Sequence, residues 1–246
     1  MMWYSDWQFW SAIAAFGALV LSQLPPLGTL LKKGKLEVKK HTSVLVHHAI
    51  GTPNLNLYVS LKNIGGRTTN IEKIQIRLTR DGAEFPVLVG SGYYSDMTTQ
   101  QLTMFTPIDL GSGEKWSHTV NFHEKWNRTQ QQKFRAMSSK VRDTINGKFV
   151  LDPQPVGGRH QAEPEQIEEI QNQFNSNFKW LPGEYKGCLE VLDSVGNLLI
   201  VDEFKFTLFE TESDELKAAS NDYRFGYGVH LPISDKQFGL SIELTQ

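Results

Sequence analysis

Hydrophobic and polar positions divide the chain into two parts with different periodicities. Residues 7–24 carry no charged side chain, and the uncharged run continues through Pro25 and Pro26 to Leu31. A membrane-spanning helix needs about 20 mainly apolar residues, and apolar residues surround this segment instead of forming one stripe. The pattern therefore predicts a transmembrane helix within an anchor of residues 1–34. The proline pair ends or bends that helix because proline lacks a backbone N–H donor.

Two other interpretations of the apolar segment fit the sequence less well. A cleaved secretory signal begins with basic residues and ends with small residues at the cleavage site. Here Asp6 precedes the apolar run, and the run ends in Leu-Pro-Pro-Leu. A buried helix of a globular domain would show one apolar stripe and one polar face. We therefore expect an anchor that is not cleaved.

Basic residues follow the apolar segment, whereas no lysine or arginine precedes it. The positive-inside rule then places the N-terminus outside and the rest of the chain in the cytoplasm. Tryptophans at the start of the segment are typical of a membrane–water interface, and lysines after it would contact anionic lipids. The residues expected at this interface are Trp3, Trp7, Trp10, Lys32, Lys33 and Lys35.

One face of the predicted helix carries small side chains. Helices approach each other closely where such residues line the contact, so this face could support a homo-oligomer. Small residues are also common in membrane helices that do not self-associate, and the sequence leaves both interpretations open. The residues on this face are Ser11, Ala14, Ala15, Ala18 and Ser22.

After residue 34 the pattern changes to a two-residue alternation. In "LNLYVSLKN" the apolar side chains of Leu55, Leu57, Val59 and Leu61 share one face, and similar segments recur between turns rich in Gly, Asn and Asp. Such alternation is typical of antiparallel strands with one buried face. About six to nine short strands of this kind favour a β-sandwich. We therefore expect residues 35–246 to form a mainly β cytoplasmic domain.

A helical insertion interrupts the predicted strands at about residues 124–178. Apolar side chains recur there at helical spacing, first at Phe134, Met137 and Val141 and again at Ile167 and Ile170. The first helix is basic and the second is acidic. The two helices could pair by opposite charge or leave their charges in solvent, and we favour these interpretations. The alternative is contact with lipid or a partner through Lys133, Arg135, Lys140 and Arg142.

Two segments resemble parts of immunoglobulin-like domains. The first is Leu181–Glu210, in which Pro-Gly-Glu-Tyr follows Leu181, and the second is "SLKNIGGRTTNIEKIQI". The resemblance implies a tyrosine corner at Tyr185 that braces the last hairpin, although the Cys…Trp…Cys core of antibody domains is absent. The layout also resembles bacterial single-pass proteins with a short N-terminal anchor, which implies an inner-membrane location. Immunoglobulin-like domains share no single activity.

Composition and motifs give little evidence for a specific catalytic or binding chemistry. The net charge is −2, so nucleic acid is not an expected partner. Cys188 is the only cysteine, which excludes an internal disulfide and a thiolate-rich metal site. "HEKWN" at His123 lacks the second histidine of a zinc-protease helix, and no phosphate loop or nucleophile elbow is present. We expect no catalytic, cofactor-binding or metal-binding residues. The acidic run from Glu210 to Glu215 predicts an exposed loop.

The function that fits these patterns is a membrane-tethered, non-catalytic protein-interaction module at the inner face of a bacterial membrane. Its expected partners are membrane lipids and another protein. An alternative is an oligomeric membrane effector or sensor of a stress or anti-phage defence system, which acts through its transmembrane helix. A lesser alternative is a hydrolase whose site carries no familiar motif.

Overall fold

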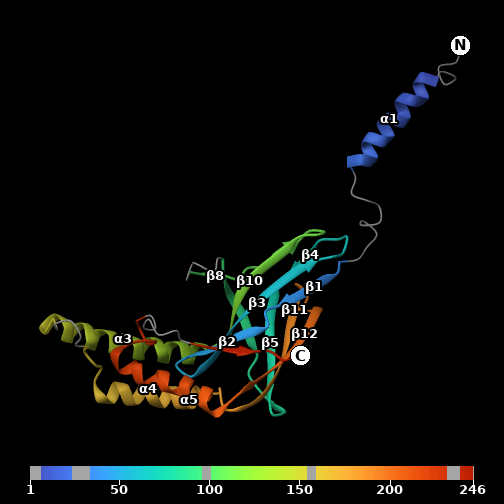
Figure 1. Ribbon diagram of the computed structural model, residues 1–246. Coiled ribbons are helices and arrows are strands. Elements are labelled where there is room, and N and C mark those ends of the chain that lie inside the picture. The colour runs from blue at the N-terminus through green and yellow to red at the C-terminus, as the bar shows by residue number, and fades with distance from the viewer. Residues whose placement is uncertain (1–6, 24–33, 96–100, 154–158, 232–238, 246) are drawn as a thin grey trace.

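The computed structural model describes residues 7–23, 34–95, 101–153, 159–231 and 239–245 (Figure 1). The helices are α1 (Trp7–Gln23), α3 (Arg128–Leu151), α4 (Pro164–Asn177), α5 (Glu210–Ala218) and the 3₁₀ helix η2 (Ala219–Phe225). The strands are β1 (Leu36–Lys40), β2 (Ser43–Ala49), β3 (Thr52–Asn63), β4 (Thr69–Ile71), β5 (Lys73–Arg80), β6 (Ala83–Glu84), β7 (Leu88–Tyr94), β8 (Leu102–Met104), β9 (Ile108–Leu110), β10 (Lys115–Glu124), β11 (Gly183–Leu192), β12 (Leu198–Leu208) and β13 (Leu240–Glu243). The predicted mainly β chain with a helical insertion is confirmed.

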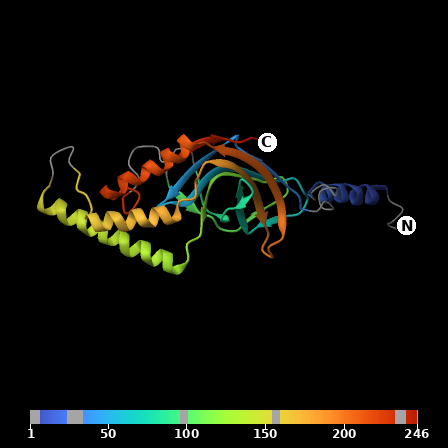
Figure 2. The same ribbon diagram turned by 90° about the horizontal axis from the view of Figure 1, so that it is seen from below.

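Most strands belong to one antiparallel sheet. Its main path runs β12-β11-β5-β7-β10-β3-β2-β13, and β1, β6 and β8 extend β3, β5 and β7. β4 and β9 form a separate two-stranded sheet. Sequence alternation predicted the strands and their antiparallel pairing. It also suggested two stacked sheets, whereas the structure has one continuous sheet that curls on itself (Figure 2).

The two ends of the curled sheet meet in a seam. Just after β13, the backbone of Thr245 exchanges two hydrogen bonds with Lys205 of β12, at N···O distances of 3.0 and 2.8 Å. Beside this bridge, the Lys40 ammonium of β1 donates to the Asp202 carboxylate of β12 at 2.5 Å. Contacts across the seam satisfy backbone groups that the outer strands of an open sheet would leave unpaired. The sheet is therefore nearly closed.

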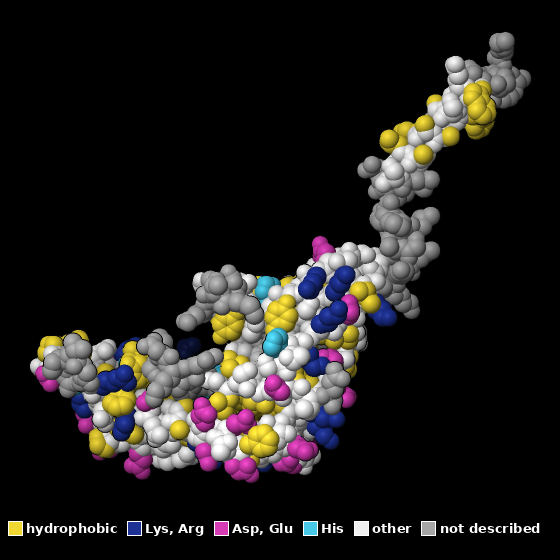
Figure 3. Space-filling view, viewed as in Figure 1, with side chains coloured by type: hydrophobic (Ala, Val, Ile, Leu, Met, Phe, Trp, Pro, Cys, Tyr) yellow, Lys and Arg dark blue, Asp and Glu magenta, His cyan; other side chains and the backbone are white. Residues whose placement is uncertain are grey.

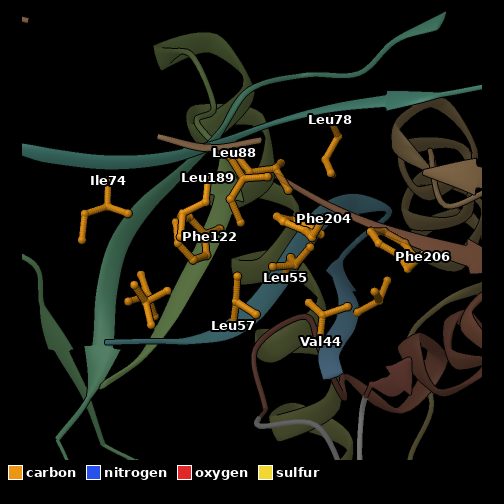
Figure 4. Close-up of a cluster of buried hydrophobic side chains, with 14 of the residues drawn as sticks. Val44, Leu55, Leu57, Ile74, Leu78, Leu88, Phe122, Leu189, Phe204 and Phe206 are labelled. Atoms are coloured by element: carbon orange, nitrogen blue, oxygen red, sulfur yellow. The ribbon is translucent and has the colours of Figure 1, made fainter. Parts of the chain in front are cut away.

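The concave side of the sheet holds the main hydrophobic core (Figure 4). The predicted inward positions of β3 and β5, such as Leu55, Leu57 and Ile74, are fully buried. Phe122 and Phe204 fill the centre of this core. The Phe204 ring lies so close to Gly187 that a Cβ added there would be 2.3 Å from it. Because Gly187 has no side chain, the Phe204 ring can pack directly against β11.

The helices α3, α4, α5 and η2 gather at one end of the sheet, with a smaller core of their own (Figures 1 and 2). Met137 and Val141 of α3 pack there with Ile170 and Phe174 of α4, as their helical spacing predicted. A capping box begins α3: the Asn127 side chain accepts from the Gln130 N–H, and the Gln130 side chain accepts from the Asn127 N–H. The segment from Glu210 is helical in α5, so the predicted exposed loop is wrong.

The predicted transmembrane helix corresponds to α1, which ends at Gln23 after 17 residues. At a rise of 1.5 Å per residue this helix is about 26 Å long, shorter than a hydrocarbon core of about 30 Å. Among the residues that the structure describes, no helix is both long and apolar enough to cross a membrane. The proline pair and the other residues of 24–33 lie outside the described part of the chain.

Candidate functional site

The first candidate surface is α1 itself, which exposes large apolar side chains. Exposed fractions are 83% for Trp7, 54% for Trp10, 68% for Phe16 and 61% for Leu19. These side chains lie on different sides of the helix, as expected for a segment without a polar face. Of the other predicted interface residues, Lys35 is exposed at the start of the sheet, whereas Trp3, Lys32 and Lys33 lie outside the described residues.

The small-residue face of α1 is also exposed at every position. Ser11 and Ser22 each donate a hydroxyl hydrogen bond to a backbone carbonyl three residues earlier, to Gln8 at 2.9 Å and Leu19 at 2.7 Å. Their hydroxyls are thus satisfied within the helix. Homo-oligomer formation through Ser11, Ala14, Ala15, Ala18 and Ser22 stays a prediction.

The four basic residues predicted on α3 do not form one patch. At 100° per residue, Lys133 and Lys140 flank one side of the buried stripe, and Arg135 and Arg142 flank the other. Arg142 pairs with the neighbouring Asp143 at 3.1 Å. Only one ion pair between α3 and the acidic segment is formed by the described residues, from Lys148 to Glu163 at 2.8 Å. Most of the opposite charge on the two helices therefore faces solvent.

A pocket on the outer face of β1, β3 and β10 brings three lysines together. Its volume is about 200 Å³, and its lining residues are Glu37, Lys39, Ser60, Lys62 and Lys115. Strand register explains the cluster, because Lys62 of β3 lies directly opposite Glu37 of β1 on one side and Lys115 of β10 on the other. Figure 3 shows Lys and Arg side chains gathered on one part of the face that it draws.

A larger groove of about 540 Å³ lies near the helices, between the β5–β6 hairpin and the segment after α4. Its walls combine aromatic side chains, Phe85 and Phe178, with the cations Arg80 and Lys179. Lys179 pairs with Glu124 at 2.9 Å, so its charge is partly balanced. Arg80 Nε lies 3.9 Å from the Asp81 carboxylate, and Glu84 also lines the groove. The aromatic walls beside the Arg80 guanidinium suit a ligand that joins an apolar group to a carboxylate.

Tyr185 lies beside this groove, since its ring contacts the Phe85 ring at a centroid distance of 5.8 Å. Its hydroxyl donates to the Leu181 carbonyl at 2.7 Å, four residues upstream, which is the contact that a tyrosine corner makes. The Tyr185 ring stacks on Phe206 at a centroid distance of 4.8 Å. Burial raises the pKa of the Tyr185 hydroxyl to about 12. Tyr185 is therefore a neutral hydrogen-bond donor at neutral pH.

A polar network crosses the outer face of β2, β3 and β10. Asn121 donates to the Asn56 side-chain oxygen at 2.6 Å, and the Nε2 atom of His47 lies 3.4 Å from the same oxygen. Burial lowers the pKa of His47 to about 4. Nearby, His123 Nδ1 lies 2.9 Å from the Ser91 hydroxyl. No acidic side chain contacts that His123 imidazole in the described structure, so the pair lacks the third member of a catalytic triad.

A buried carboxylate lies on the outer side of β5 and β11. Glu190 is 5% exposed and accepts from Gln75 at 2.6 Å, with Arg77 Nε 2.9 Å away. Burial, and then the Glu190 charge, raises the pKa of the neighbouring Cys188 thiol. A thiol that stays protonated is a poor nucleophile. Within the described ranges, no group of three His, Cys, Asp or Glu side chains could hold a metal ion.

Sequence reasoning missed the lysine pocket because its residues come from three separate strands. The alternation of "LNLYVSLKN" did carry one signal, since it placed Lys62 on the outer face opposite Leu61. Lys39 and Lys115 have the same outward positions in their own strands. What the sequence lacked was the order in which β1, β3 and β10 lie side by side.

Comparisons with known proteins add no functional assignment. No family model matches the chain, and no curated protein matches it. One solved structure, a beta-glucosidase from Listeria innocua in complex with glucose, is 16% identical over 72% of this chain, with a TM-score of 0.27. The match covers 16% of the beta-glucosidase chain. A likeness at that TM-score carries no argument about fold or activity.

Proposed function

We propose that this protein is a membrane-tethered, non-catalytic interaction module with its sheet on the cytoplasmic side of a bacterial inner membrane. The observation that carries the proposal is α1, whose apolar side chains are exposed around the helix. Burying one large apolar side chain releases about 1.5–3 kcal/mol, so several of them provide a strong tendency to enter a bilayer. The lysines after α1 support the cytoplasmic side.

The groove beside the helices is the proposed contact for a protein partner. The β5–β6 hairpin and the segment after α4 line this groove. Figures 1 and 2 show α3, α4 and α5 at the end of the sheet away from α1. A membrane-bound domain would therefore present this groove toward the cytoplasm. Phe178 and Leu181 supply apolar contact, and Arg80 supplies charge, for a partner segment that carries both apolar and acidic side chains.

Flotation with neutral phosphatidylcholine vesicles tests the membrane attachment. The full chain should float with the vesicles, and the double variant Phe16→Asp/Leu19→Asp should lose at least about 100-fold of this binding, because two carboxylates would enter an apolar phase. The matched control is Phe149→Asp/Leu151→Asp, at 59% and 87% exposed positions near the end of α3. It should float like the wild type.

Two results would contradict the proposal. If Phe16→Asp/Leu19→Asp floats as well as the wild type, α1 is not the attachment. If the α3 control detaches instead, the exposed apolar end of α3 contacts the membrane and the proposed arrangement is wrong. Far-UV circular dichroism of both variants checks that the sheet is intact.

A further inference from the structure

We propose that the pocket lined by Lys39, Lys62 and Lys115 binds the phosphate-bearing head group of an anionic phospholipid. This inference rests on the proposed function, because it takes the lipid from the membrane to which α1 would attach. It adds a specific site on the folded domain to the apolar contact made by α1. The pocket lies on the outer face of the sheet and is separate from the partner groove.

The first support is a pair of like charges on neighbouring strands. Lys62 and Lys115 are directly opposite each other on neighbouring antiparallel strands. Side chains in such positions have Cβ atoms about 4.5–5.5 Å apart, and like charges there destabilise the sheet. Lys39 adds a third ammonium to the same pocket. A bound anion would relieve this repulsion.

The acidic side chains nearby do not cancel the charge. Glu37 also lines the pocket, directly opposite Lys62 and 3.4 Å from Lys39, and its single charge can balance only one of the three lysines. Glu114, next to Lys115 in sequence, accepts a hydrogen bond from the Gly111 N–H at 2.7 Å, so its carboxylate is turned to that loop. The pocket therefore keeps a positive charge.

Ser60 gives the pocket a neutral polar group. It is 6% exposed, and its oxygen accepts a hydrogen bond from the Ser117 hydroxyl at 3.0 Å. The Ser60 hydroxyl proton is therefore not used in the bond with Ser117 and can be donated to an anion. With a volume of about 200 Å³, the pocket is smaller than typical sites for drug-sized ligands and suits a head group.

The position of the pocket favours a lipid as the source of the phosphate. Lys39 and Lys62 lie on β1 and β3, and β1 is the strand that begins directly after Lys35. The Ile64 N–H donates to the Lys35 carbonyl at 2.8 Å, which holds this chain entry against the end of β3. Lys39 and Lys62 thus lie near the end of the sheet at which β1 begins, and β1 is the first strand after α1 in the chain.

The test compares the full chain on neutral vesicles with its binding to vesicles that contain one part phosphatidylglycerol in three. The wild type should bind the anionic vesicles more tightly, and Lys62→Gln/Lys115→Gln should reduce this gain by about 10- to 30-fold. Its binding to neutral vesicles, which depends on α1, should not change. Equal unfolding midpoints verify that the variant is folded.

The chain contains a matched control for this variant. Lys186 of β11 and Lys205 of β12 are also directly opposite each other, so Lys186→Gln/Lys205→Gln removes the same charge from the same kind of strand pair. Glu184 and Glu203 lie two residues away on the same strands, so an acidic side chain is near each of these lysines. The control should keep the full gain on anionic vesicles.

The outcomes separate the inference from the proposed function. Equal losses in the two double variants, or no loss in Lys62→Gln/Lys115→Gln, would overturn the site. If the wild type does not bind neutral vesicles but binds anionic ones, the result contradicts attachment through α1 and still supports the pocket. If glycerol phosphate in solution binds the protein at submillimolar concentration without vesicles, and only with Lys62 and Lys115 intact, the site serves a free phosphate compound and the lipid assignment is wrong.

Discussion

At the scale of single residues, His48 joins the sheet to the helices through its neutral form. Its Nε2 atom donates to the Leu216 carbonyl at 2.8 Å. Its Nδ1 atom is then unprotonated and accepts from the Gly51 N–H and the Tyr223 hydroxyl, both at 3.3 Å. Burial lowers the pKa of His48, because a charged imidazole would be poorly solvated there.

We expect the free energy of unfolding to fall as the pH is lowered from about 7.5 to about 5. His47 and His48 both have pKa values below 6.5 in the folded state, about 4 for His47. As the pH falls through 6.5, the unfolded chain binds protons first, so the stabilisation present above that pH is progressively lost. Urea unfolding at the two pH values measures the change. The double variant His47→Gln/His48→Gln should show a weaker pH dependence.

The matched control for this prediction is His41→Gln, which alters an exposed histidine. It should keep the pH dependence of the wild type between these two pH values. If all three proteins respond equally to pH, then groups other than the two buried histidines cause the loss of stability.

At the scale of elements, glycine has opposite consequences in a strand and in a helix. Gly187 of β11 faces the Phe204 ring, and a Cβ there would overlap the ring. Gly147 lies inside α3, and a Cβ there would meet no other atom within 4 Å. Both residues are glycines in regular structure, where glycine is intrinsically unfavourable. Only at Gly187 does packing against a neighbouring side chain explain why the residue is glycine.

Alanine at these two positions should therefore shift stability in opposite directions. Gly187→Ala should lower the free energy of unfolding by about 1–3 kcal/mol, because the Phe204 ring or β11 must move. Gly147→Ala should raise it by about 0.5–1 kcal/mol, because alanine favours the helix. Urea titration with fitted slopes measures both, and a Gly187→Ala protein as stable as the wild type would disprove the close packing.

At the scale of the whole molecule, the seam between β1, β12 and β13 decides whether the sheet closes. The Lys40 and Asp202 side chains are 21% and 27% exposed, and the Lys40 ammonium also donates to the Glu203 carbonyl at 3.0 Å. A partly buried pair is screened less than an exposed pair. The ion pair should therefore contribute to closure beyond the backbone bridge of Lys205 and Thr245.

A double-mutant cycle with Lys40→Gln and Asp202→Asn should measure a coupling of about 1 kcal/mol. The same cycle with Lys39→Gln and Glu37→Gln should measure a coupling near zero, because those side chains are 73% and 42% exposed. Both cycles are measured by urea unfolding. Equal couplings would mean that the seam pair is no more than a surface contact.

Local patterns predicted much of the architecture. Two-residue alternation identified the buried face of β3 at Leu55, and helical spacing identified the buried side of α3 at Met137, because each pattern depends only on nearby residues. Local charge was a weaker guide at α5. The acidic run that contains Glu210 and Glu212 predicted a loop, but acidic side chains also stabilise the first turn of a helix. The Glu212 carboxylate accepts from the Phe209 N–H at 2.8 Å.

The sequence by itself determined the class of most segments: an apolar N-terminal helix, antiparallel strands with one buried face, and a helical insertion. Tertiary structure alone decided that the strands form one nearly closed sheet, that Lys62 lies between Glu37 and Lys115, and that Phe204 covers Gly187. The physical reason is that periodicity reports which side of a strand is buried. The order and register of strands follow from hydrogen bonds and packing between residues far apart in the chain, and these leave no local pattern.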